Sequence, residues 1–229
     1  MRGARTVMIG FARLSAVFST MLQLCSAQQA PQDFCVGSRS VVVAAQNGGN
    51  RAYAETVAKR PKPKAGTGVV AVACTDRAKL FVSVVNEDFQ LAYMQAPTQS
   101  WPGAEMKLVD WSPTGEYLLV DLFTFQFEGE GAGHSPLIYD ADSGLVYTPD
   151  LFKLFKAHFK KACDAPSSIE GFTSDGLILL KVGPLIRDTT FEPLTYPSCV
   201  KEKGYWAVDF KKDEIKFIAN HYEAKKYSH

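Results

Sequence analysis

The sequence predicts a mainly β protein built from antiparallel meanders and hairpins, with one amphipathic helix at about residues 149–162. Short apolar runs alternate with clusters of Gly, Asp, Asn and Ser, the residues that tight turns between antiparallel strands require. The 17 Gly and 12 Pro are spread through the chain, which favours many short elements over a few long helices. Only one segment spaces its apolar residues with the period of a helix.

The composition is that of a globular protein. Of the 229 residues, 46% are hydrophobic and 21% are charged, and the formal net charge is +1. These values exclude an intrinsically disordered, collagen-like or coiled-coil chain. Because neither charge sign is in large excess, we expect no nucleic-acid partner.

Residues 1–27 have the layout of a secretory signal peptide. Three arginines and no acidic residue come first, an apolar stretch occupies residues 14–24, and small residues lead to Ala27. We therefore expect cleavage after Ala27, a single mainly-β domain over residues 28–229, no transmembrane segment after cleavage, and a secreted or periplasmic location. A lipoprotein signal ending at Cys25 is the alternative.

Four cysteines remain once residues 1–27 are removed. An even number of cysteines in an exported chain favours two disulfides, for which three connectivities exist. We expect the pairs Cys35–Cys74 and Cys163–Cys199. No two of these cysteines have a short metal-binding spacing and none has a histidine at ligand spacing, so neither a metal nor another cofactor is expected.

The expected strands follow one another in hairpins. Residues 40–45 form an apolar run that predicts a buried strand, closed by turn residues 46–50. The remaining strands are expected at residues 80–85 and 90–94, 106–111 and 116–127, 136–139 and 145–147, 177–182, 205–210 and 214–219. A calcium-binding loop starting at residue 140 would need Gly at its sixth position and Glu at its twelfth, where Leu145 and Leu151 stand, so a hairpin turn over residues 140–144 explains this segment.

The helix prediction rests on caps and spacing. Thr148 is the expected N-cap, Pro149 the first helical residue, and apolar residues recur at helical spacing as far as Ala162. Its apolar stripe could cover three rings, at residues 123, 125 and 127, that share one face of a strand. His158 is expected at the edge of the core. A helix lying on a membrane surface would show the same pattern, but the caps favour a packed helix.

The chain also repeats itself. Residues 111–120 align with residues 172–181, since both contain an aromatic residue, a hydroxyl residue, a turn closed by Gly and an apolar strand. A second correspondence lies downstream, between residues 138–144 and residues 207–213. Two similar meanders are therefore expected.

These residues resemble in part the WD40-like repeats of periplasmic TolB-type β-propellers. Those repeats carry a W-S-P-D-G turn before a strand and later an aromatic-x-D-x-x-[ST]-G hairpin. The match is best over residues 109–147 and partial over residues 171–217, where the second copy lacks the Trp and the Pro. Closed propellers need at least four blades. The resemblance therefore implies an incomplete propeller-like or sandwich-like stack of two or three meanders, and it implies interaction surfaces.

The candidate functional residues are Trp101, His134 and Ser135. The last two follow a glycine-rich stretch at residues 128–133, but there is no nucleophile elbow and no set of acid-base residues with catalytic spacing. We expect a non-enzymatic binding or interaction protein of unknown specificity that engages a protein or a cell-envelope component. A small secreted hydrolase with its site at His134 and Ser135 is the alternative.

Overall fold

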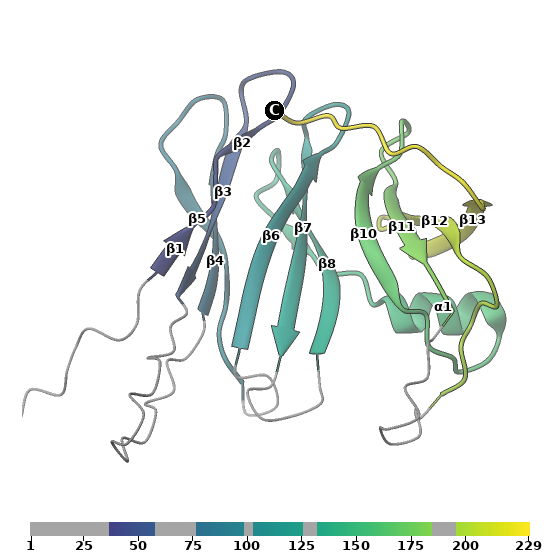
Figure 1. Ribbon diagram of the computed structural model, residues 1–229. Helices are drawn as coiled ribbons and strands as arrows, with labels where there is room; N and C mark the ends of the chain where they lie inside the picture. Colours follow the sequence, from purple (N-terminus) through teal and green to yellow (C-terminus); the bar gives the residue numbers. More distant parts are fainter. Residues whose placement is uncertain (1–36, 58–76, 99–102, 126–131, 185–195) are drawn as a thin grey trace, which may run out of the picture. The chain divides into compact units, whose positions relative to one another are not determined.

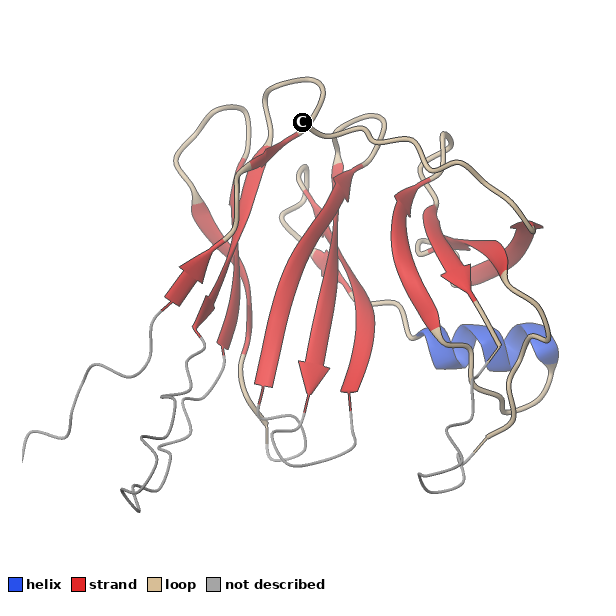
Figure 2. Cartoon of the chain, viewed as in Figure 1, coloured by secondary structure: helices blue, strands red, loops and turns tan. Residues whose placement is uncertain are grey.

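The computed structural model describes residues 37–57, 77–98, 103–125, 132–184 and 196–229, all within a single unit that spans Phe34–His229. These ranges contain three antiparallel sheets and one helix (Figures 1 and 2). The first sheet consists of β1 (Gly37–Arg39), β2 (Val43–Ala44), β3 (Arg51–Val57), β4 (Arg77–Ser83) and β5 (Gln90–Gln95). The second consists of β6 (Gly103–Trp111), β7 (Tyr117–Phe125), β8 (Ala132–Asp140) and β9 (Val146–Tyr147). The third consists of β10 (Ser167–Phe172), β11 (Ile178–Val182), β12 (Gly204–Asp209) and β13 (Glu214–Ala219).

The expected buried strand at residues 40–45 is wrong in part. The structure has only the short strand β2 in this range, after β1 has ended at Arg39, and Val41 and Val42 between the two strands are exposed, Val41 by 79%. Ser40 explains the break, because its backbone N–H donates to the Ala54 carbonyl while its hydroxyl accepts from the Ala54 N–H. The hydroxyl thus takes the place of a backbone partner, and Val41 and Val42 bulge out of the ladder.

The second and third sheets are copies of one meander. In each, four strands pair in sequence order, and the first strand carries a bulge at the same aligned place, between Leu108 and Asp110 in β6 and between Ile169 and Gly171 in β10. The predicted repeat is therefore confirmed as two sheets of equal topology. The sequence-based prediction missed β10 and also β3, both of which contain charged or small residues that interrupt the apolar pattern.

The turns of the two copies share their hydrogen bonds. Gly115 and Gly176 close the first turn of each copy with a positive φ of 75° and 79°, and each donates its N–H to the carbonyl of the hydroxyl residue three positions before it. At the later hairpin, the carboxylates of Asp140 and Asp209 each accept from the backbone N–H groups two and three residues ahead. The chemistry that defined the repeat in the sequence is the chemistry that closes its turns.

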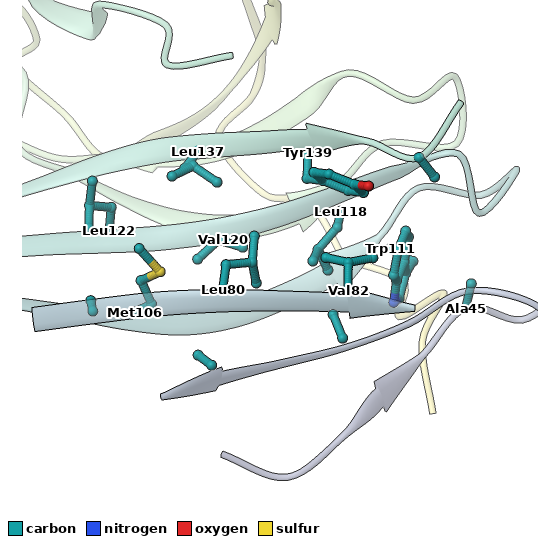
Figure 3. Close-up of a cluster of buried hydrophobic side chains, with 14 of the residues drawn as sticks. Ala45, Leu80, Val82, Met106, Trp111, Leu118, Val120, Leu122, Leu137 and Tyr139 are labelled. Carbon is teal, nitrogen blue, oxygen red and sulfur yellow. The ribbon is translucent and has the colours of Figure 1, made fainter. Parts of the chain in front are cut away.

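A first core cluster lies between the first and second sheets (Figure 3). Leu80 and Val82 of β4 meet Leu118 and Val120 of β7 there, and Trp111 fills one end. The indole N–H of Trp111 donates to the Val43 carbonyl at 3.1 Å, so this large ring is buried without an unpaired polar group.

A second core cluster lies on the other face of the second sheet. Leu119 and Ile138, which alternate with members of the first cluster, pack there with Phe172 and Ile178 of the third sheet. The second sheet is thus buried on both faces at this end, which explains why residues 118–120 and 137–139 are apolar without alternation.

The helix, α1 (Leu151–Phe159), is shorter than predicted at both ends. Asp150, not Thr148, is the N-cap, because its carboxylate accepts from the Lys153 N–H at 3.0 Å. At the other end Lys160 adopts a left-handed conformation with φ of 53°, which stops the helix before Ala162. No helix in the described ranges is long and apolar enough to cross a membrane.

The apolar side of α1 packs on the third sheet. Leu154 and Phe155 join the second core cluster, and the Phe155 ring meets the edge of Trp206 at 5.5 Å. The rings that we expected under the helix contact each other instead, with Phe123 and Phe125 stacked at 5.4 Å. The third ring, Phe127, lies outside the described residues.

A disulfide joins Cys163, just after α1, to Cys199, just before β12, as predicted. It closes a loop across 36 positions of sequence. The predicted partners Cys35 and Cys74 both lie outside the described residues.

The C-terminal segment connects all three sheets. After β13 it returns along the second sheet, where the Tyr227 N–H donates to both oxygens of the Asp110 carboxylate at 3.1 and 3.2 Å, and the Lys226 ammonium donates to the Val109 carbonyl. His229 then exchanges two backbone hydrogen bonds with Ala44 of β2 (Figure 1). Asp110 is fully buried, so this segment supplies the partner that its carboxylate needs.

Replacing Cys163 and Cys199 together with serine should lower the free energy of unfolding by about 3–4 kcal/mol, because the open chain regains the entropy of the loop. Urea denaturation of both proteins measures the difference. An equal stability of the oxidised wild type and the double variant would contradict this role of the disulfide.

Replacing Asp110 with Ala should lower the free energy of unfolding by about 1–3 kcal/mol, because the buried Tyr227 N–H loses its acceptor. Asp110→Asn, which keeps one acceptor oxygen, should cost less. The exposed Asp142→Ala is the control, and thermal denaturation ranks all four proteins. A ranking in which Asp110→Ala equals the control would show that the C-terminal segment is held by other contacts.

Candidate functional site

The structure holds His134 in place from two sides. Its Nδ1 lies 3.0 Å from both oxygens of Asp121, and its ring lies 4.7 Å from that of Phe123, which is its partner in the β7–β8 register. The His134 side chain is 51% exposed, whereas Asp121 is 15% exposed. The carboxylate therefore orients an imidazole that solvent can still reach.

Ser135 does not join this arrangement. Neighbouring residues of a strand point to opposite faces, and Ser135 pairs with Leu122, whose side chain belongs to the first core cluster. His134 shares its face with Phe123 instead. Within the described ranges, no hydrogen bond links the Ser135 hydroxyl to the imidazole, so the two residues do not form a nucleophile-base pair here.

The third candidate functional residue, Trp101, lies outside the described residues. Phe123 and Phe125 are half-buried, and Phe125 lies flat over Gly103, where a Cβ would come within 2.3 Å of the ring. The structure thus brings His134 together with two of the expected rings.

Away from His134, a concavity lies between α1 and the hairpin of β12 and β13. It has a volume of about 580 Å³. Apolar side chains line part of it, and acidic and basic side chains line the rest. The apolar lining residues are Leu154, Ala157, Leu177, Ala207 and Ile215. The charged ones are Asp175, Asp209, Asp213, Glu214, Lys212 and Lys216, joined by His158.

A second concavity of about 320 Å³ lies between the two glycine turns of the repeat. One wall is the turn of the second sheet at residues 112–117, and the other is the turn of the third sheet at residues 174–177. Both concavities are lined by Asp175, Leu177 and Asp209. We call the two together the long groove, because they share these three lining residues.

Two carboxylates, those of Asp175 and Asp209, line both concavities. A hydrogen bond from the Thr173 hydroxyl at 2.6 Å lowers the pKa of Asp175. Burial raises the pKa of Asp209, but hydrogen bonds from Lys212 and from the Lys211 N–H outweigh it, so this pKa also lies below its ordinary value. Both side chains are therefore ionised at neutral pH.

This chemistry suits binding better than proton transfer. A general acid or base needs a pKa near the working pH, and these two carboxylates are shifted the other way. They can attract a cation, while the apolar lining can receive an apolar side chain. In the part of the chain that the structure describes, no three His, Cys, Asp or Glu side chains gather where they could hold a metal ion.

The sequence contained a signal for this groove. Asp209 belongs to the second copy of the repeat, where it corresponds to Asp140, and the repeat predicts a turn residue at that position. His158 was expected at the core edge, yet it is exposed, contacts the edge of Trp206 at 5.2 Å and lines the groove. The packing of α1 near the β12–β13 hairpin, which forms this groove, could not be predicted from the sequence.

No model of a protein family matches the chain, and no curated protein matches it at a significant level.

Proposed function

We propose that this is an exported, non-enzymatic binding protein whose long groove takes an extended polypeptide segment of a partner protein. The observation that carries the proposal is that the two concavities adjoin, because Asp175, Leu177 and Asp209 line both. An extended segment needs an elongated site, and backbone and side chains together can fill one.

The charges of the groove indicate the chemistry of the segment. Four acidic residues line the larger concavity against two lysines, and one of those lysines, Lys212, is already paired with Asp209 at 3.1 Å. A segment with lysine or arginine beside apolar residues complements such a surface.

Two observations support export. The disulfide between Cys163 and Cys199 is typical of proteins that mature in an oxidising compartment. The N-terminal 27 residues have the order of charge, apolar core and small residues that export signals share. The partial resemblance to TolB-type repeats agrees with an interaction role in a cell envelope.

A secreted hydrolase is the second candidate, because the contact between His134 and Asp121 is one that acid-base catalysis uses. The position of Ser135 on the other face speaks against it.

The wild type should therefore turn over no ester, peptide or glycoside substrate in a broad screen. Replacing His134 and Ser135 together with Ala should leave the thermal unfolding temperature nearly unchanged, because both side chains are exposed. Turnover by the wild type that the double variant loses, at equal stability, would establish the hydrolase instead.

The internal repeat supplies a matched pair of variants for the groove. Asp209→Asn removes the charge but keeps the acceptor oxygen that closes the turn, and Asp140→Asn does the same at the corresponding turn, whose residues do not line either concavity. Peptides selected from a random library should be rich in lysine and arginine. Asp209→Asn should weaken their binding about fivefold, the effect of one partly exposed charge pair.

Asp140→Asn should bind the same peptides as the wild type does. Fluorescence anisotropy of labelled peptides gives both affinities, and thermal denaturation shows whether the two variants lose equal stability. Equal binding by both variants, or selected peptides without basic residues, would contradict the proposed groove.

A further inference from the structure

A lysine cluster forms the outward side of α1. It consists of Lys153, Lys156, Lys160 and Lys161, which we call the lysine face. All four side chains are exposed, and together with Ala157 they line a shallow concavity of about 400 Å³. Their spacing of three, four and one positions places them on one side of the helix and its C-cap.

These ammonium groups have no anionic partner within the described ranges. No ion pair there involves any of the four lysines, and Leu151–Phe159 contains no acidic residue. Like charges this close repel one another, which costs stability when nothing neutralises them.

Helix stability explains all but one lysine of the cluster. A cation near the C-terminal end of a helix is favourable, as for Lys156, Lys160 and Lys161, but Lys153 lies in the first turn, where the helix dipole repels a positive charge. An external anion removes this conflict.

Two aromatic rings lie beside the cluster. Phe152 is 40% exposed and Tyr196 is 37% exposed, and their centroids are 5.3 Å apart. Phe152 precedes Lys153 directly and lies one helical turn before Lys156. Lysines along one side of a helix, with exposed aromatic rings at the edge of that side, are features of helices that lie on an anionic bilayer.

We propose that the lysine face docks on the surface of an anionic phospholipid membrane. The ammonium groups contact lipid phosphates, while the stems of the lysines and the Phe152 ring lie against the interface. Nucleic acid fits this surface less well, because single strands follow a charged groove between elements and these lysines lie along a single helix.

Membrane docking does not depend on peptide binding in the long groove. The two surfaces meet at Ala157, which lines both, so a docked protein would present its groove beside the bilayer. Variants of the lysines leave Asp209 and its turn unchanged, and failure of one proposal is therefore separable from failure of the other.

Co-sedimentation of the full chain with vesicles tests the proposal. One set of vesicles contains one part phosphatidylglycerol to two parts phosphatidylcholine, and the other contains phosphatidylcholine alone. Binding by the N-terminal apolar segment is common to all variants and is measured with the neutral set. We expect binding to the anionic vesicles in excess of the neutral ones, decreasing as salt is raised.

Replacing all four lysines of the face with Gln should abolish that excess, since each lysine near an anionic surface contributes about a fivefold gain in partitioning. A matched variant replaces four other exposed lysines with Gln, namely Lys107, Lys181, Lys203 and Lys225. It has the same net charge and should retain most of the excess. Circular dichroism confirms that α1 persists, because Gln and Lys have similar helix propensities.

Equal losses in the two variants would overturn the proposal, because they would show attraction by net charge alone. No excess with the anionic vesicles would also overturn it. Tight binding of a single-stranded oligonucleotide that needs the same four lysines, without vesicle binding, would assign the face to nucleic acid instead.

Discussion

Burial of the second sheet on both faces is the constraint on which the rest of the fold depends. Its central strands are apolar without alternation, so a single covering layer would leave half of those side chains in water. The first sheet covers one face and the third sheet the other, through two separate core clusters. Asp110 lies within this arrangement, and its buried carboxylate accepts hydrogen bonds from the Trp111 N–H and from the Tyr227 N–H.

The two meanders of equal topology occupy different environments. The second sheet has a covering sheet on each face, whereas the third packs against α1 on one part of its surface and contributes to the groove with another. Asp140 and Asp209 show the result, because the same turn chemistry is purely structural in one copy and lines a concavity in the other. A repeated motif can thus line a concavity in one copy and not in the other without any change in its own hydrogen bonds.

Turn chemistry made most of the fold predictable from sequence. Glycine turns and Asp-closed hairpins are local, so the strands beside them, the internal repeat and one disulfide could all be inferred. The errors arose where the contact of a single side chain decides whether an element continues or ends. Ser40 breaks a strand through its contact with Ala54, and the caps of α1 depend on whether Thr148 or Asp150 reaches the helix N–H groups. The groove escaped prediction because its walls come from α1 and a hairpin that are far apart in sequence, whereas His134 was predicted as a functional residue only because it follows a glycine-rich stretch.

The contact between Tyr227 and Asp110 spans 117 positions of sequence, and the pairing of His229 with Ala44 spans still more. A ribosome delivers residue 44 long before residue 229, so during synthesis the three sheets can assemble locally while Asp110 still lacks the Tyr227 N–H. Contacts this distant close late and slow the final step of folding. Until the C-terminal segment arrives, the buried Asp110 carboxylate has fewer N–H donors than in the folded protein, which favours opening of the second sheet.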